Sequence, residues 1–275
     1  MKKVFSKVSA LAITTMVLAT SCTKTGATGP AGAAGGTGST GPALTGTVVG
    51  YVDLFDQYGE LLPASAAGEV YLTSPNLAAN WKDSTYVSSG GANTYSTTLT
   101  TGTYQFNVST KTGGFGNLLI NSMNFVGGGT QYNTAHIQLA QVPTFSVTGL
   151  SVGTSTSTFN PAVTTTVTIA GGDIAKSRKA IIFFGSANTV SSNPGTYLGF
   201  TTVTINPNSY TVSANISCTS VLFPAGADSS ATIYLNAYPI SYNTAASAYP
   251  DVNTGKTIFN SIGVSTVTTP SVVVP

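Results

Sequence analysis

TGTVVGYVDL, residues 45–54 of this 275-residue chain, alternates its side chains in a way that decides the class of fold. In an extended backbone successive side chains point to opposite faces, so Val48, Val52 and Leu54 share one face with Gly50. Period-two alternation of this kind predicts a β-strand with one buried face. We therefore expect an all-β chain whose first folded part starts with this strand.

Similar strands follow as far as residue 140. Asp56-Gln57-Tyr58-Gly59 has the composition of a turn, and Thr101-Gly102 predicts another. The residues expected to face the core after the first turn are Val70, Leu72, Tyr95, Thr97, Leu99, Tyr104, Phe106, Val108, Ala135, Ile137 and Leu139. Together these strands predict one β-sandwich over residues 45–140.

Four segments carry a resemblance to a known family, namely residues 46–54, 56–59, 70–72 and 102–106. They resemble the carboxypeptidase regulatory-like domain. The resemblance implies a small prealbumin-like β-sandwich of the kind found as an accessory module in surface proteins of Bacteroidetes-type bacteria. It implies no catalytic residues, because the family has none of its own to carry over.

Residues 143–275 predict a second sandwich, after a boundary at Ala140-Gln141-Val142-Pro143. Residues 180–184 are apolar on both faces, so we expect this strand to be central in its sheet. Short strands separated by Gly, Pro and Asn turns predict an immunoglobulin-like or fibronectin-like sandwich. The expected strands are residues 145–150, 163–170, 180–184, 197–205, 209–216, 232–238 and 257–259, the last continuing into 262–267.

The N-terminus has the pattern of an export signal. Lys2, Lys3 and Lys7 precede an apolar run over residues 8–19, which is shorter than the about 20 residues of a membrane-spanning helix. Residues 18–22, Leu-Ala-Thr-Ser-Cys, resemble the bacterial lipobox. The pattern predicts a lipoprotein signal peptide over residues 1–21.

The lipobox resemblance implies that Cys22 is lipidated and becomes the mature N-terminus. Its acyl chains would make the membrane a partner and place the protein at the bacterial outer membrane or cell surface. The alternative is ordinary cleavage at Ala19-x-Ser21, which would give a soluble secreted protein with a free thiol.

A glycine-rich segment, residues 22–44, links the cysteine to the strands. Glycine recurs at every third position from Gly26 to Gly41, as in collagen, but over only six triplets and with little proline. We expect a flexible spacer, which as a coil of about 24 residues would span roughly 25–30 Å. A trimeric collagen-like stalk is the alternative.

Composition argues against several classes of function. Only 7% of the residues are charged, and without the signal peptide seven basic residues face eight acidic ones. Such a near-neutral charge balance gives no electrostatic reason to expect nucleic acid or an acidic substrate as a partner. His136 is the sole histidine, and we expect no metal and no cofactor. Asp53, Asp56 and Glu60 are the densest acids, with calcium binding as the alternative to a simple strand-end turn.

A few other residues are candidates for contacts. Trp81, the sole tryptophan, is the candidate ligand-binding residue, because an aromatic face can stack on a sugar ring; packing within a sandwich is the alternative. Phe115, between glycines, is a second exposed candidate. Lys176-Ser177-Arg178-Lys179 is interpreted as a solvated strand edge. Ser84 lies in a weak O-glycosylation motif, and Cys218 is expected to be a small buried hydrophobe.

The chain lacks a Gly-x-Ser-x-Gly elbow and a phosphate-binding loop, so we predict no catalytic residue. The favoured hypothesis is a lipid-anchored, non-enzymatic bacterial envelope protein whose sandwiches serve display, adhesion or assembly, with an unidentified glycan or protein partner. The second hypothesis is a carbohydrate-binding accessory lipoprotein. The third, a hydrolase built from scattered acids, would need two carboxylates about 5–9 Å apart.

Overall fold

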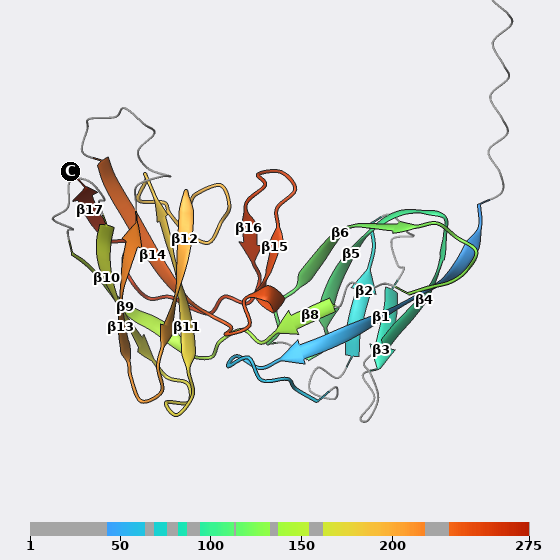
Figure 1. The fold of residues 1–275 in the computed structure, drawn as a ribbon, viewed down its shortest axis with the longest axis horizontal. Helices are drawn as coiled ribbons and strands as arrows, with labels where there is room; N and C mark the ends of the chain where they lie inside the picture. Colours follow the sequence, from blue (N-terminus) through green and yellow to red (C-terminus); the bar gives the residue numbers. More distant parts are fainter. Residues whose placement is uncertain are drawn as a thin grey trace, which may run out of the picture. The chain divides into compact units, whose positions relative to one another are not determined.

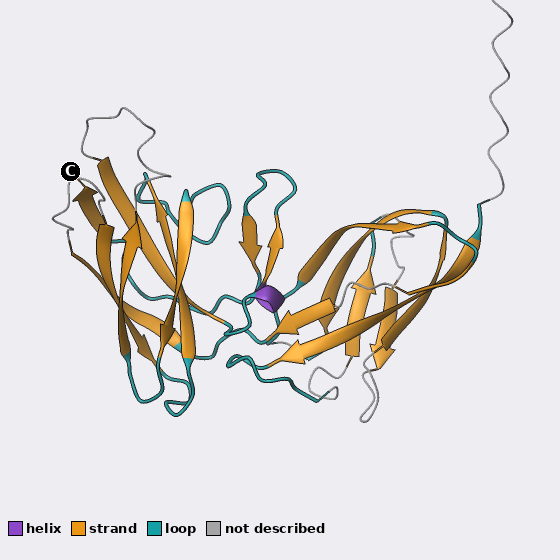
Figure 2. Cartoon of the chain, in the orientation of Figure 1, coloured by secondary structure: helices purple, strands orange, loops and turns teal. Residues whose placement is uncertain are grey.

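The computed structural model of the chain describes residues 43–63, 69–75, 82–86, 94–112, 114–132, 137–153, 162–217 and 231–274. These residues belong to one compact unit, Ala43–Pro275, built almost entirely of strands (Figures 1 and 2). The predicted signal peptide, Cys22 and the spacer as far as residue 42 lie outside the described residues, as do Trp81, His136 and Cys218. Among the described residues, no helix has the length and apolar character needed to cross a membrane.

The first half of the unit is a sandwich of two sheets around β1 (Thr45–Phe55). In one sheet β1 pairs antiparallel with β4 (Thr94–Thr100) and parallel with β7 (Gly129–Tyr132) and β8 (Ile137–Ala140). The order of the other sheet is β3 (Lys82–Tyr86), β2 (Glu69–Thr73), β5 (Gly102–Thr110) and β6 (Leu118–Phe125).

The predicted alternation of β1 is confirmed. Val48, Val52 and Leu54 are at most 1% exposed and pack in one core with Phe106 of β5 and Leu139 of β8. Both sheets therefore contribute their apolar faces to the same core, as a sandwich requires.

The second half of the unit is built in the same way. One sheet has the order β13 (Thr211–Ser217), β10 (Ala162–Ala170) and β9 (Ser146–Gly153). The other has the order β12 (Gly199–Ile205), β11 (Arg178–Gly185), β14 (Ala231–Ile240) and β17 (Ser271–Val274). Alternate residues of β10 and β11 meet in one core, and β11 lies between two strands, which confirms the predicted central position of residues 180–184.

A short hairpin covers the outer face of the second of these sheets. It consists of β15 (Ala248–Pro250) and β16 (Thr257–Phe259), and a single 3-10 turn, η2 (Ala245–Ser247), precedes it. Phe183 of β11, fully buried, contacts Phe259 of the hairpin with ring centroids 5.6 Å apart. The Tyr197 hydroxyl donates to the Thr257 carbonyl (2.7 Å) and accepts from its N–H (3.0 Å). The hairpin is thereby held on the sheet.

Three expectations are wrong. Residues 262–267 form only isolated bridges, Ile240 with Ile262 and Val147 with Ser265, and the final strand is β17. Tyr210, expected within the strand of residues 209–216, precedes β13 and is 51% exposed. Phe115, expected to be exposed, is 9% exposed and belongs to the first core, since its backbone pairs with Gln141.

Candidate functional site

The turn that follows β1 lies where the two sandwiches meet. The Asp56 Oδ1 atom accepts hydrogen bonds from the N–H groups of Tyr58 and Glu60, each 2.8 Å long. Gly59 closes the turn with φ +88°, a left-handed value that favours glycine. The predicted turn is confirmed, and Asp56 is committed to holding its shape.

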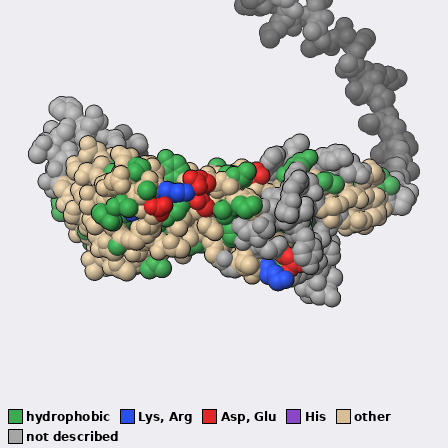
Figure 3. All heavy atoms as spheres, turned by 90° about the horizontal axis from the view of Figure 1, so that it is seen from below, with side chains coloured by type: hydrophobic (Ala, Val, Ile, Leu, Met, Phe, Trp, Pro, Cys, Tyr) green, Lys and Arg blue, Asp and Glu red, His purple; other side chains and the backbone are tan. Residues whose placement is uncertain are grey.

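Tyr58 and Glu60 connect this turn to the loop between β10 and β11. The Tyr58 hydroxyl accepts from the N–H of Asp173 (2.6 Å), and the Lys176 ammonium bonds Glu60 Oε2 (2.6 Å). The hydrogen bond to Glu60 raises the pKa of Lys176, with further contributions from the charges of Glu60, Asp56 and Asp173. Figure 3 shows acidic and basic side chains side by side on a face that is otherwise mostly uncharged.

Gln57 makes a second connection, in both directions. Its side chain accepts from the Thr144 N–H (2.8 Å) and donates to the Thr144 hydroxyl (3.1 Å). Its carbonyl accepts from the N–H of Tyr242 (3.1 Å), just after β14. The short turn therefore contacts three separate segments of the second sandwich.

The interpretation of residues 176–179 as a solvated strand edge is wrong. Arg178 is fully buried, and its guanidinium donates to the carbonyls of Gly171 (3.1 Å) and Ser209 (2.6 Å). Lys179 donates to the Tyr242 carbonyl (2.7 Å), and burial lowers its pKa. Arg178 and Lys179 stand at the start of β11, a central strand, and the carbonyls of nearby loops are their acceptors.

A third connection joins the end of β8 to the segment after the hairpin. The buried Ser261 hydroxyl donates to the Ala140 carbonyl (2.8 Å), which also accepts from the Gly116 N–H (3.0 Å). The Asn260 side chain donates to the Asn117 carbonyl. A Cβ atom on Gly116 would lie 2.5 Å from both the Asn260 carbonyl oxygen and Ser261 Oγ, so only glycine fits without displacement.

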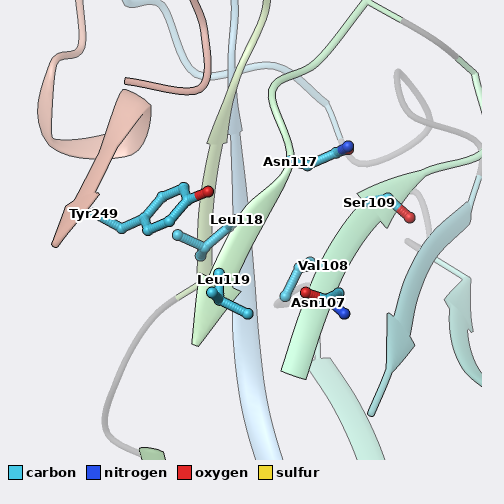
Figure 4. A pocket seen from close by; sticks show the side chains of 7 residues that line it. All are labelled: Asn107, Val108, Ser109, Asn117, Leu118, Leu119 and Tyr249. Carbon is cyan, nitrogen blue, oxygen red and sulfur yellow. The ribbon is translucent and has the colours of Figure 1, made fainter. Parts of the chain in front are cut away.

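Beside this contact lies a pocket of about 250 Å³. Figure 4 shows Tyr249 extending from β15 toward β6, with β5 as the next strand. The lining residues are Asn107, Val108, Ser109, Asn117, Leu118, Leu119 and Tyr249. The sequence did not single out these residues, because residues 107 and 249 meet only when the hairpin docks beside β6. The one signal in the sequence is the polar character of β5 at its outward positions, Asn107 and Ser109.

Two of the three acids considered for calcium, Asp56 and Glu60, are used elsewhere. Asp56 holds the turn and Glu60 pairs with Lys176. Within the described residues, no three His, Cys, Asp or Glu side chains are grouped as a metal site would require. In the same way Asp173 accepts from the N–H of Ala175, and Asp251 accepts from Thr254. These carboxylates hold loops.

Alkaline pH is expected to destabilise the fold. Burial raises the pKa of Tyr197, Tyr238 and Tyr249, and the charge of Asp251 adds to this for Tyr197 and Tyr249. Unfolded tyrosines lose their protons near pH ~10, whereas the folded ones keep them to higher pH. The folded state then binds more protons, so stability falls as pH rises above about 10.

Lys179 acts in the opposite direction. Its lowered pKa means that the folded state releases this proton first, which favours folding as pH rises toward about 10.4. Three tyrosines outnumber one lysine, so the net result above pH ~10 is a lower thermal midpoint. Thermal unfolding followed between about pH 8 and 11 measures the effect, and Tyr238→Phe should reduce it. A midpoint that stays constant across this range would contradict the expectation.

Neither a protein-family model nor a curated protein matches this chain. Among solved structures it is similar to a DUF3823 family protein from Parabacteroides merdae, at 15% identity and TM-score 0.24, with 72% of this chain and 91% of that chain covered. A DUF3823 family protein from Bacteroides ovatus is similar at 16% identity and TM-score 0.24, with 70% of this chain and 91% of that chain covered. The Bacillus anthracis TIE protein is similar at 9% identity and TM-score 0.23, with 81% of this chain and 33% of that chain covered. Likeness at these TM-scores assigns neither a family nor a function.

Proposed function

We propose that this chain is a non-enzymatic, lipid-anchored protein of the bacterial envelope whose β-sandwiches serve display, adhesion or assembly. The observation that carries the proposal is the use of the carboxylates. Asp56, Asp173 and Asp251 hold turns, and Glu60 and Glu69 pair with Lys176 and Lys111. Acids that serve as fixed supports suit a scaffold better than acid–base chemistry, which needs a carboxyl within reach of substrate.

The anchor is the second part of the proposal. It is supported by the charged start, the short apolar run and the Ser21-Cys22 pair in the sequence. Acyl chains on Cys22 would bind the bilayer, each buried methylene adding about 0.8 kcal/mol. Glycine-rich residues 22–44 would then keep the sandwiches away from the membrane surface, at the outer membrane or the cell surface.

The carboxypeptidase regulatory-like identity of residues 45–140 is also part of the proposal. Its support is the set of segments quoted from the sequence, of which residues 46–54 lie in β1 and residues 102–106 in β5. As an accessory module, such a domain would support the second sandwich and help to present it to a partner.

Cys22→Ser is the test of the anchor. In the native host the wild-type chain is expected in the membrane fraction, and the variant in the soluble fraction, because the sulfur that would carry the acyl group is gone. Mass spectrometry of the N-terminal peptide should find acyl chains on Cys22 only in the wild type. Cys218→Ser serves as the matched control and should stay with the membrane.

An unmodified Cys22 in the mature wild-type chain, or a Cys22→Ser variant that stays in the membrane fraction, would contradict the anchor. Protease treatment of intact cells tests display separately. A surface protein should be digested in intact cells, whereas a periplasmic protein should be digested only after the outer membrane is opened.

A further inference from the structure

We propose that the pocket between β5, β6 and the β15–β16 hairpin binds one ring of a neutral saccharide. The proposal goes beyond the envelope role and does not depend on the anchor at Cys22. It rests on the polar groups that surround the pocket, on its apolar wall, on its lack of charge and on its size.

Four polar side chains lie around the pocket. Within the described part of the chain, the side chains of Asn107, Ser109 and Asn117 form no hydrogen bond with another described residue, and neither does the Tyr249 hydroxyl. Two amides and two hydroxyls offer both donors and acceptors. Sugar hydroxyls need both, since each one donates and accepts.

Some asparagine side chains in other parts of this fold form hydrogen bonds. The Asn260 amide donates to the Asn117 carbonyl, the Asn236 amide donates to the Val190 carbonyl, and Asn193 accepts from the Gly195 N–H. Those amides hold loops and strands in place. The side chains of Asn107 and Asn117 form no hydrogen bond with another described residue, and both residues are exposed beside the pocket.

One wall of the pocket is apolar. Leu119 of β6 lies opposite Asn107 of β5 on the outer face of this sheet, and the half-buried Tyr249 extends toward β6 from the hairpin (Figure 4). Leu118, the residue before it, packs against the first core. An apolar wall with a polar rim matches a pyranose ring, whose faces carry C–H groups and whose edges carry hydroxyls. Burial, with the charge of Asp251, raises the pKa of Tyr249, so its hydroxyl stays protonated and can donate.

Charge and size narrow the class of ligand. None of the seven lining residues is charged, so a phosphate or carboxylate would enter without a counter-charge. The volume of about 250 Å³ is below the roughly 300–1,000 Å³ of sites for drug-sized molecules. One uncharged ring with hydroxyl groups fits these limits.

Ligand-observed NMR on the full chain, purified in a detergent without sugar head groups, tests the proposal. The probes are glucose, galactose, mannose and N-acetylglucosamine at about 10 mM each, because a ligand of this size reaches only roughly millimolar affinity. At least one should give a saturation-transfer signal. Asn107→Ala and Tyr249→Ala should each weaken that binding about fivefold or more. The first variant loses a hydrogen bond to the sugar, and the second loses the aromatic ring that contacts it.

Asn206→Ala is the matched control, because Asn206 is an exposed amide on the turn after β12. It should bind like the wild type. Tyr249→Phe keeps the ring and should bind more tightly than Tyr249→Ala, which separates loss of contact from loss of the hairpin. The proposal is overturned if none of the four sugars binds, if binding survives in both pocket variants, or if only glucuronate or an extended peptide binds.

Discussion

Arg178→Ala is expected to lower the free energy of unfolding by about 3–5 kcal/mol and the thermal midpoint by roughly 10 °C. Arg178 is fully buried at the start of β11, and its guanidinium donates to the Gly171 and Ser209 carbonyls. Truncation leaves two acceptors without their donor, at about 1–3 kcal/mol each, and removes the packing of the aliphatic stem. Urea unfolding and calorimetry measure the loss.

Lys176→Ala provides the comparison, because Lys176 is a cation only two residues away. Its side chain is 34% exposed and it pairs with the exposed Glu60, so its removal should cost much less stability than the loss of Arg178. Equal losses for the two variants would show that Arg178 acts as an ordinary surface charge. A change below about 1 kcal/mol for Arg178→Ala would refute its role as a buried support.

Gly116→Ala is expected to cost about 1–3 kcal/mol and to loosen the contact beside the pocket. The added Cβ would lie 2.5 Å from the Asn260 carbonyl oxygen, and backbone cannot turn aside as a flexible side chain can. The segment at residues 260–261 must therefore move, which weakens the bond from Ser261 to the Ala140 carbonyl. Faster hydrogen exchange at the Ser241 N–H, which donates to the Ser261 carbonyl, should accompany the loss of stability.

Gly153→Ala is the matched glycine control. At Gly153, which ends β9, the nearest atoms to an added Cβ are 3.8 Å away, which is ordinary contact. This variant should stay within about 0.5 kcal/mol of the wild type. If Gly116→Ala is equally harmless, the close approach at the Asn260 carbonyl does not constrain the fold.

The strands were predictable because burial leaves a period-two pattern in sequence. Val48, Val52 and Leu54 in β1, and Val163, Val167 and Ile169 in β10, face their cores as the alternation predicts. The pattern failed at residues 262–267, where Val264 is 68% exposed although it stands in an alternating stretch. There the chain pairs with β14 at Ile262 and with β9 at Ser265, each through a single bridge. A local sequence pattern cannot predict an isolated bridge of that kind, because it depends on segments distant in the sequence.

The candidate site was far less predictable. Arg178 looked like a surface charge because a run of basic residues is usually solvated, and its acceptors, the carbonyls of Gly171 and Ser209, belong to loops at other positions in the chain. The pocket joins residues 107 and 249, which are distant in sequence and meet only through the docked hairpin. Sequence patterns report which side chains are buried, whereas a site depends on which segments meet.

The position of β1 has a mechanical consequence. A load applied through the N-terminal segment enters the fold at Thr45, the first residue of a strand that has neighbours on both sides, β4 on one and β7 with β8 on the other. A pull directed along β1 must break the hydrogen bonds to the neighbouring strands on both sides at the same time, instead of one pair after another. The first strand of the fold would therefore resist extraction in shear.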